Sequence, residues 1–406
     1  MAKPTIRFIG FDDEWEQRKF GEITELKSAS RVHKDEWTSD GVPFYRSSDV
    51  MAAINGTENE KAFISEELYE KLSKASGKLE EGDILVTGGG SVGNPYIVPD
   101  NKPLYTKDAD LLWIKNKGKF HPYFLYEFFF SPTFRNYLGS ISHVGTIAHY
   151  TITQLSDTPI CLPSFEEQKE VGEYFQSLDH LITLHQRKCD ETKKLKKYML
   201  QKMFPQNGSK VPEIRFKGFT DEWEQRKLGE VLKERSERAN GSEELLSVTI
   251  GNGVIKQADS DKRNTASDDK SNYKIVRKGD LPYNSMRMWQ GAVGNSEYDG
   301  IVSPAYTVLV PTEEANSKFF MELFKKESTL QIFQRWSQGL TSDTWNLKYP
   351  ALSTIQFYIP SVFEQTKIAD YFIQLDHLIT LHQHKCEELK KLKKFMLQNM
   401  FTQKNK

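Results

Sequence analysis

The chain has 406 residues, and its 55 basic side chains nearly balance its 56 acidic ones. This length exceeds that of one ordinary domain and suffices for two domains with separate cores. Because the formal net charge is only -1, a whole-chain electrostatic attraction to nucleic acid is excluded, and any basic footprint must be local.

Residues 1–18 lack the apolar core of a secretion signal, and no apolar run approaches the length of a membrane span. The apolar run at 124–130 is short, and we interpret it as the buried face of a helix. Three cysteines do not make a disulfide framework, which suits a reducing cytosol. We therefore expect a cytoplasmic protein without a membrane partner.

A segment near the start of the chain recurs in its middle. Residues 6–22 read IRFIGFDDEWEQRKFGE and residues 214–230 read IRFKGFTDEWEQRKLGE, at an offset of 208. Such self-similarity marks a duplicated unit. The stretches that follow, 23–162 and 231–359, are mostly unlike, so the two halves share their ends and differ in their middles.

Both middles have the pattern of mixed α and β structure. Short β-branched or aromatic runs bounded by glycine, proline or asparagine predict strands and hairpins. These runs are 84–87, 96–98 and 306–310. Helical patterns follow at 121–138 and 317–336. Residues 205–209 have linker character, because a proline stops the preceding helix and small polar residues lead into the second half.

The run Gly88–Gly93 matches the dinucleotide-binding pattern G-x-G-x-x-G and follows a predicted strand. That pattern requires a helix at its last glycines, whereas Asn94, Pro95 and a second strand-like run follow here. The order favours a strand-turn-strand hairpin over a nucleotide site. Glycines in such a turn could still let backbone amides come close to a phosphate.

The strongest repeat lies in two predicted long helices. Residues 178–204 and 375–401 are identical at all but five of 27 aligned positions, at an offset of 197. Ser164 and Ser361 can act as N-caps, and Glu167 and Glu364 three residues later can complete capping boxes.

In each helix the residues of one stripe recur at a spacing of three and four positions, so each helix has one face to bury against a partner. Two such helices in one chain most simply pair as a coiled coil, and the pattern leaves parallel and antiparallel pairing open. The predicted pairing residues are Leu178, Ile182, His185, Cys189, Leu195 and Met199 in the first helix and Leu375, Ile379, His382, Cys386, Leu392 and Met396 in the second.

A histidine and a cysteine lie one helical turn apart in each helix, at His185 and Cys189 and at His382 and Cys386. An antiparallel pair could bring these four zinc ligands together. We interpret them as ordinary residues of the stripe, because the spacing recurs simply through repetition of the whole helix, and we expect no metal.

The sequence predicts no catalytic centre. The acid-x-lysine spacing of many metal nucleases occurs at Asp100–Lys102 and Asp268–Lys270, but it arises often by chance in a chain with 27% charged residues. The tripeptide at 94–96 lacks the second proline of the adenine-methyltransferase tetrapeptide, and no suitable glycine loop for S-adenosylmethionine accompanies it.

Polar, aromatic and basic clusters in the unlike middles offer the groups that read base edges in DNA. The candidate DNA-contacting residues are Tyr45, Arg46, Ser47, Ser91, His143, Thr146, His149, Asn284, Arg287, Trp289 and Gln290. An arginine such as Arg46 or Arg287 can equally hold a surface ion pair. The lysine runs at 193–197 and 390–394 could touch phosphate, although a solvated helix face is the default interpretation.

The repeats together resemble the specificity subunits of type I restriction-modification systems. The most specific motifs are G-F-x-D-E-W-E-Q-R-K-x-G-E at 10–22 and 218–230, and L-K-K-x-M-L-Q-x-M-F at 195–204 and 392–401. Three further segments of the second middle are similar to a recurring class of target recognition domain. These are residues 277–280, 284–291 and 303–306.

The resemblance implies an α+β fold with two mixed α/β target recognition domains, each followed by a long helix, and antiparallel pairing of the helices as a spacer. The implied segments are 1–163 and 205–360 for the domains and 164–204 and 361–406 for the helices. Each domain would read one half of a bipartite, asymmetric target in double-stranded DNA.

The resemblance also implies partners. Two modification subunits would carry S-adenosylmethionine and methylate an adenine in each half-site, and restriction subunits would supply cleavage driven by ATP with Mg²⁺, in defence against phage. The chain itself would bind no cofactor and catalyse nothing. A different interpretation remains open, in which the chain is a coiled-coil assembly scaffold whose globular halves bind proteins and no DNA. Salt-dependent, sequence-specific DNA binding would separate the two.

Overall fold

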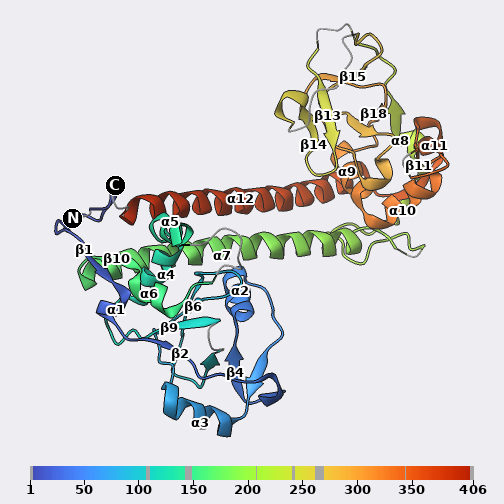
Figure 1. Ribbon diagram of the computed structural model, residues 1–406. Coiled ribbons are helices and arrows are strands. Elements are labelled where there is room, and N and C mark those ends of the chain that lie inside the picture. Colours follow the sequence, from blue (N-terminus) through green and yellow to red (C-terminus); the bar gives the residue numbers. More distant parts are fainter. Residues whose placement is uncertain are drawn as a thin grey trace. The chain divides into compact units, whose positions relative to one another are not determined.

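The computed structural model describes residues 3–106, 110–141, 149–206, 208–239, 243–260, 269–342 and 344–402. The chain divides into two compact units, Met1–Gln186 with His384–Lys406, and Arg187–Gln383. Each unit holds one globular domain and part of each of two long helices, α7 (Phe165–Lys202) and α12 (Val362–Met400) (Figure 1). The four-segment division at 163, 204 and 360 stays a prediction, since the compact units divide each long helix.

The globular domain of the first unit mixes short helices and strands. Its elements are β1 (Glu16–Lys19), α1 (Phe20–Ile23), β2 (Leu26–Ser28), η1 (Lys34–Glu36), β3 (Trp37–Thr38), β4 (Val42–Tyr45), α2 (Ser47–Asn55), β5 (Ala62–Ile64), α3 (Glu66–Ser76), β6 (Ile84–Thr87), β7 (Pro95–Ile97), β8 (Tyr105–Thr106), β9 (Leu111–Ile114), α4 (Pro122–Phe130), α5 (Pro132–Ile141), α6 (Ile152–Asp157) and β10 (Pro159–Leu162). One sheet has the antiparallel order β2-β9-β6-β7. A second has the order β3-β5-β4-β8, in which β4 and β8 are parallel.

The globular domain of the second unit has a related element order. Its elements are β11 (Glu224–Lys227), α8 (Leu228–Val231), β12 (Leu232–Glu234), β13 (Leu246–Thr249), β14 (Gly253–Lys256), η2 (Gln257–Asp259), β15 (Lys274–Val276), β16 (Leu281–Asn284), η3 (Met288–Gln290), β17 (Gly300–Val302), β18 (Tyr306–Pro311), α9 (Ser317–Lys325), α10 (Glu327–Trp336), α11 (Tyr349–Thr354) and β19 (Gln356–Ile359). The strands β12-β18-β16 form an antiparallel sheet. The β11–β19 ribbon matches the β1–β10 ribbon of the first unit.

The apolar run at 124–130 lies in α4, whose Phe124, Leu125, Phe128 and Phe129 are buried, as predicted. These side chains join the core of the first unit, so the run serves packing. Across the described ranges, no helix is long and apolar enough to cross a membrane.

The two helical patterns predicted at 121–138 and 317–336 each form two helices, with a break at Ser131 and at Lys326. Ser131 is extended, with φ -66° and ψ 149°, because the proline that follows disfavours a helical residue before it. Lys326 is also extended, with φ -65° and ψ 134°, although no proline follows. Its buried side chain donates to the carbonyl of Pro205 at 3.3 Å, so a tertiary contact accompanies this break.

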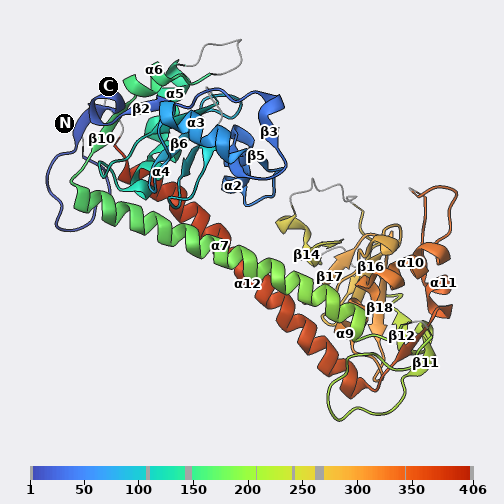
Figure 2. The ribbon, with the colours of Figure 1, turned by 90° about the horizontal axis from the view of Figure 1, so that it is seen from below.

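The long helices pair antiparallel in the first unit. The ammonium of Lys393 in α12 contacts Asp179 in α7 at 2.7 Å, and the thiol of Cys386 lies 3.9 Å from the carbonyl of Ile182. Residue numbers therefore increase along α7 in the direction in which they decrease along α12 (Figure 2). This settles the direction that the repeated pattern leaves open.

The second unit pairs the other halves of the same helices in the same sense. The thiol of Cys189 lies 3.9 Å from the carbonyl of Ile379, and Lys196 contacts Asp376 at 2.6 Å. Each of these contacts is equivalent to one in the first unit, with the roles of α7 and α12 exchanged. The repeat offset of 197 residues relates the two contacts of each pair.

Each core is completed by a phenylalanine at the end of a long helix. Phe401 packs in the first unit, with its ring centroid 6.5 Å from Trp15 and 5.3 Å from Phe124. Its repeat equivalent Phe204 packs in the second unit, 5.4 Å from Phe319. The first half of the chain therefore needs the C-terminal helix to fill its core, and the second half needs the central helix.

The repeated opening segments dock on the starts of the long helices. Arg7 donates to both carboxylate oxygens of Glu167 at 2.6 and 2.7 Å, and Arg215 does the same to Glu364 at 2.7 Å. The backbone amides of Glu167 and Glu364 bond to the predicted caps, at 3.3 and 3.5 Å. The sequence predicts that the side chains of Glu167 and Glu364 complete capping boxes. Their buried carboxylates instead form ion pairs with the two arginines, because a bidentate arginine is a stronger donor than a backbone amide.

The structure places most of the predicted pairing residues on the inner side of the helices. Leu178, Cys189, Leu375 and Cys386 are buried, and Ile182, His185, Met199, Ile379, His382 and Met396 are half-buried.

The prediction is wrong for Leu195 and Leu392, which are 43% and 41% exposed. The inward line runs through Cys189, Lys196 and Met203 at a spacing of seven residues, and Leu195 lies about 100° around the helix from Lys196. In both helices the lysine that follows the leucine turns inward to meet acidic partners.

Candidate nucleic-acid interface

Strands β6 and β7 form the hairpin predicted over the glycine run, with Ile84 opposite Ile97. In the turn, Gly93 donates to the carbonyl of Thr87 at 2.7 Å. Gly93 has φ +76°, and a Cβ there would lie 2.8 Å from Leu138, so both the turn and the packing require glycine. The glycines therefore have a structural explanation that needs no dinucleotide.

Arg135 holds this turn from α5. Its guanidinium donates to the carbonyl of Val92 at 3.2 Å and to the side chain of Asn94 at 2.9 Å. Burial lowers the pKa of Arg135 from its ordinary value. The anchored turn presents Ser91, a predicted DNA contact, exposed at its tip.

The start of α2 joins the same edge of the first unit. The hydroxyl of Ser47 and the backbone amide of Gly88 both donate to the carbonyl of Asp110, at 2.9 and 2.8 Å. The ring of Tyr45 lies 5.1 Å from that of Tyr96 in β7. Burial, together with a hydrogen bond to Tyr45, raises the pKa of Tyr96, so Tyr96 stays neutral.

Arg46 is committed to local contacts. Its guanidinium donates to Asp49 at 2.9 Å, bonds to the carbonyl of Glu60 and lies 5.4 Å from the ring of Trp37. These contacts tie the start of α2 to its surroundings. A base contact by Arg46 stays a prediction, and it would require these bonds to be exchanged.

The loop that precedes α6 lies against the hairpin. The amide of Tyr150 donates to the carbonyl of Gly88 at 2.8 Å, and the neighbouring His149 is exposed. The candidates His143 and Thr146 lie outside the described residues. The described candidates of the first unit are thus gathered around one hairpin.

All four candidates of the second unit lie between the last residue of β16 and the end of η3. The side chain of Asn284 accepts from the amide of Met286 at 3.0 Å and turns the chain into η3. Arg287 is exposed, and its guanidinium donates to the side chain of Gln290 at 3.2 Å. The arginine keeps further donors for a bidentate contact such as the one that reads guanine.

Trp345 contacts this loop from the segment between α10 and α11. Its ring lies 5.3 Å from that of Trp289 in an edge-to-face arrangement, and the indole of Trp289 donates to the carbonyl of Met286 at 3.1 Å. The sequence prediction missed Trp345. Trp345 lies in the segment before α11, which corresponds to the segment around His149 before α6. The similar order of elements in the two halves could have revealed this correspondence.

One backbone hydrogen bond is the same in both units. Leu347 donates to the carbonyl of Ser285 at 2.8 Å in the second unit, as Tyr150 does to Gly88 in the first. In each case the donor lies just before a short helix and the acceptor just after a buried strand. The two units thus hold a pair of loops in a common frame, and the side chains on those loops differ.

The family model for the type I restriction modification DNA specificity domain matches residues 12–194 and 220–391. These two matches span both globular domains and most of both long helices. The chain belongs to this family.

Individual members of the specificity-domain family are distant in sequence. The MjaVIII type I restriction enzyme specificity subunit of Methanocaldococcus jannaschii is 22% identical over 373 residues, 84% of each chain. A Haemophilus influenzae protein named as specificity subunit S.HindORF215P is 25% identical over 184 residues, and the match spans only 44% of either chain. A crystal structure of a type I restriction-modification S subunit from M. genitalium covers 98% of this chain and 99% of its own with a TM-score of 0.60 at 14% identity, which shows a shared fold.

The sequence prediction also missed a partly buried ionic cluster in each unit of this specificity-domain chain. In the first unit Lys393 contacts Glu127 of α4 and Asp179 of α7, at 2.8 and 2.7 Å. In the second unit Lys196 contacts Glu322 of α9 and Asp376 of α12. The lysine and aspartate recur at the offset of 197, but the glutamates lie in the unlike middles.

The zinc interpretation gains nothing from the structure. Within the described ranges, no group of three or more His, Cys, Asp or Glu side chains is arranged to hold a metal ion. The two helix cysteines are buried and face carbonyl oxygens across the helix pair.

Proposed function

We propose that this chain is the DNA sequence-recognition subunit of a type I restriction-modification complex. Its two globular domains each read one half of a bipartite target, and the half-sites lie about one turn of DNA apart. Because the loops of the two domains carry different side chains, the target is asymmetric. The chain positions two modification subunits for methylation of adenine N6 and restriction subunits for ATP-dependent cleavage.

This proposal rests on one observation: the two units hold a pair of loops together by the same backbone hydrogen bond, and the side chains that these loops expose differ. Tyr150 and Leu347 make the same 2.8 Å backbone bond to the residue after a buried strand. Around that bond the first unit offers serine, tyrosine and histidine side chains, and the second offers Asn284, Arg287 and Gln290. A constant frame with exchangeable polar tips suits a protein whose two halves read different bases.

The chemistry belongs to the partner subunits in this proposal. S-adenosylmethionine, ATP and Mg²⁺ bind to those subunits, and this chain supplies binding and position without catalysing a step. The complex works in the cytoplasm, where it meets both host DNA and entering phage DNA.

The test is a map of adenine methylation in the host genome, by long-read sequencing, with the gene intact and deleted. Loss of methylation at one bipartite, asymmetric motif is the expected result. A chain in which residues 231–359 are exchanged for those of a relative should keep one half-site and change the other. If the motif persists after deletion and the purified chain binds DNA without sequence preference, the scaffold interpretation replaces this one.

A further inference from the structure

The segment between α10 and α11, residues 337–346, forms a closed loop with a fully exposed leucine. Gln338 and Asn346 exchange both backbone hydrogen bonds across the neck of this α10–α11 loop, at 3.0 and 2.8 Å. Inside the loop the amide of Thr344 donates to the carbonyl of Thr341 at 2.9 Å. Leu340 lies between these contacts along the chain and is 101% exposed. The loop therefore holds an apolar side chain in water through its own hydrogen bonds.

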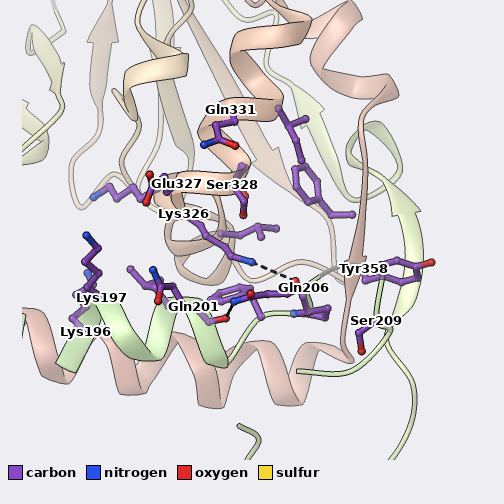
Figure 3. A pocket seen from close by; sticks show the side chains of 18 of the residues that line it. Lys196, Lys197, Gln201, Gln206, Ser209, Lys326, Glu327, Ser328, Gln331 and Tyr358 are labelled. Carbon is purple, nitrogen blue, oxygen red and sulfur yellow. Dashed lines mark hydrogen bonds between the residues drawn. The ribbon is translucent and has the colours of Figure 1, made fainter. Parts of the chain in front are cut away.

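The backbone around the exposed leucine is fixed from both sides. Gly339 has φ +145°, and a Cβ there would lie 2.6 Å from the carbonyl oxygen of Thr344, so the loop packs on itself where only glycine fits. The helix before the loop is anchored at its start, because Lys326 donates to the carbonyl of Pro205 at 3.3 Å (Figure 3). Phe333 of the same helix is buried in the core of the second unit. The leucine is thus carried by a well-supported stem.

Two contacts hold the α10–α11 loop beside the candidate DNA contacts of the second unit. Trp345 packs edge-to-face on Trp289, and Leu347 donates to the carbonyl of Ser285. Leu340 lies only five positions before Trp345. The exposed leucine therefore projects from the same edge that is proposed to read DNA.

Other apolar side chains are exposed on the same edge. A single exposed leucine is ordinary on a protein surface. Here Met286 and Trp336, in the two segments that the tryptophan contact joins, are exposed by 43% and 44%. Loop tips also favour small polar residues over a leucine. The grouping indicates a surface that a partner covers.

The charge of the two segments indicates the class of that partner. Arg287, Arg335 and Lys348 are exposed, and among the described residues none of them forms an ion pair. Residues 284–291 and 335–348 contain these three cations and one acidic residue, Asp343, so their net charge is +2. An apolar tip among unpaired cations suits DNA, which has phosphates outside and stacked bases within.

We propose that Leu340 is a wedge that inserts between two base pairs of the half-site read by the second domain and unstacks them. This inference rests on the proposed function and deepens it. Leucine is among the side chains that proteins insert between base steps, and neighbouring cations can hold the phosphates on either side. Methylation by a partner subunit requires the adenine to leave the stack, and a step that is already unstacked lowers the cost of that movement. Leu340 is thus a positioning residue and takes no part in methyl transfer.

The experiment uses the full chain in complex with its modification subunit, and a duplex that carries the mapped target. 2-Aminopurine, which fluoresces more strongly outside the stack, replaces in turn each adenine of this half-site and its flanks except the methylated one. Binding of the wild type should raise the fluorescence about threefold at one step. Leu340→Ala should remove most of this rise, and Leu340→Met should keep it. The control Ile9→Ala shortens an equally exposed side chain in the opening segment of the first unit and should leave the rise unchanged.

A duplex with a mismatch at that step separates a wedge from a merely structural residue. Leu340→Ala should bind the intact target about tenfold more weakly than the wild type, because no side chain replaces the lost stacking. It should bind the mismatched target within about twofold of the wild type, because that step is already unstacked. An equal loss of affinity on both duplexes overturns the inference, and so does a wild-type affinity for the intact target.

Failure of the proposed function looks different from failure of this inference. A wild-type complex without sequence preference in DNA binding overturns the function itself. Sequence-specific binding without a rise in fluorescence that depends on Leu340 overturns the wedge alone. If native mass spectrometry shows that Leu340→Ala loses copies of the modification subunit while the fluorescence rise persists, the leucine contacts protein and the inference fails. Because Leu340 is fully exposed, circular dichroism and thermal unfolding of the variants should match the wild type.

Discussion

Glu127 provides the sharpest test of the energetics of the fold. It is fully buried in α4, where Lys393 donates to one carboxylate oxygen at 2.8 Å. The other oxygen has no hydrogen-bond partner within the described ranges. Burial raises the pKa of Glu127 from 4.5 to about 8, against the opposing effect of Lys393. We predict that the folded chain holds a proton here at neutral pH.

The direction of the pH effect follows from this shift. Because the folded state binds the proton up to a higher pH than the unfolded state, the contribution of Glu127 is present below pH 4.5 and is lost as the pH rises toward 8. Each unit of pKa shift corresponds to about 1.4 kcal/mol. Between pH 5.5 and 7.5 the free energy of unfolding of the first unit should therefore fall by roughly 2–3 kcal/mol through this group alone.

The substitution Glu127→Gln removes the ionisable group and keeps the shape. Urea unfolding at pH 5.5 and 7.5, followed by hydrogen exchange of α4 peptides, should show a smaller pH dependence in the variant by that amount. Glu16→Gln, which removes an exposed carboxylate, is the control for the loss of an acidic side chain that is not buried. If wild type and Glu127→Gln have equal pH dependence, Glu127 is ionised at neutral pH and burial does not dominate its environment.

The remaining predictions concern the DNA edge and the docked opening segment. Arg287→Ala should relax discrimination at one base of the target by about 1–3 kcal/mol, measured by fluorescence anisotropy with single-base duplex variants, and no change in specificity would refute a base contact. Gly93→Ala should lower the free energy of unfolding by about 1–3 kcal/mol. The control Gly118→Ala has a similar φ of +71° but open space around the added Cβ, so it should lower the free energy of unfolding by less. Equal losses of stability in the two variants would show that the packing around Gly93 is unimportant. Arg7→Ala leaves the buried Glu167 carboxylate without its bidentate partner and should cost about 3–5 kcal/mol in urea unfolding, so a loss below about 1 kcal/mol would contradict the structural role of the pair.

Local sequence determined the features that depend on neighbours along the chain. The glycine run followed by Asn94 and Pro95 predicted the β6–β7 hairpin, because each strand and turn signal lies within a few residues of the next. Serines 164 and 361 predicted the helix starts for the same reason. The internal repeats predicted a duplicated architecture, and the family match agrees with it.

Tertiary structure decided the features that depend on distant partners. The repeated helix stripe would bury the same residues whether the two long helices paired parallel or antiparallel. The antiparallel direction follows from the packing of Phe401 in the core of the first unit and of Phe204 in the core of the second. The inward turn of Lys196 depends on Glu322 in the unlike middle, and this displaced Leu195 from the predicted seam. Trp345 reached the candidate DNA edge only through the fold, because it lies 56 positions after Trp289 and contacts at that distance along the chain leave no local periodicity.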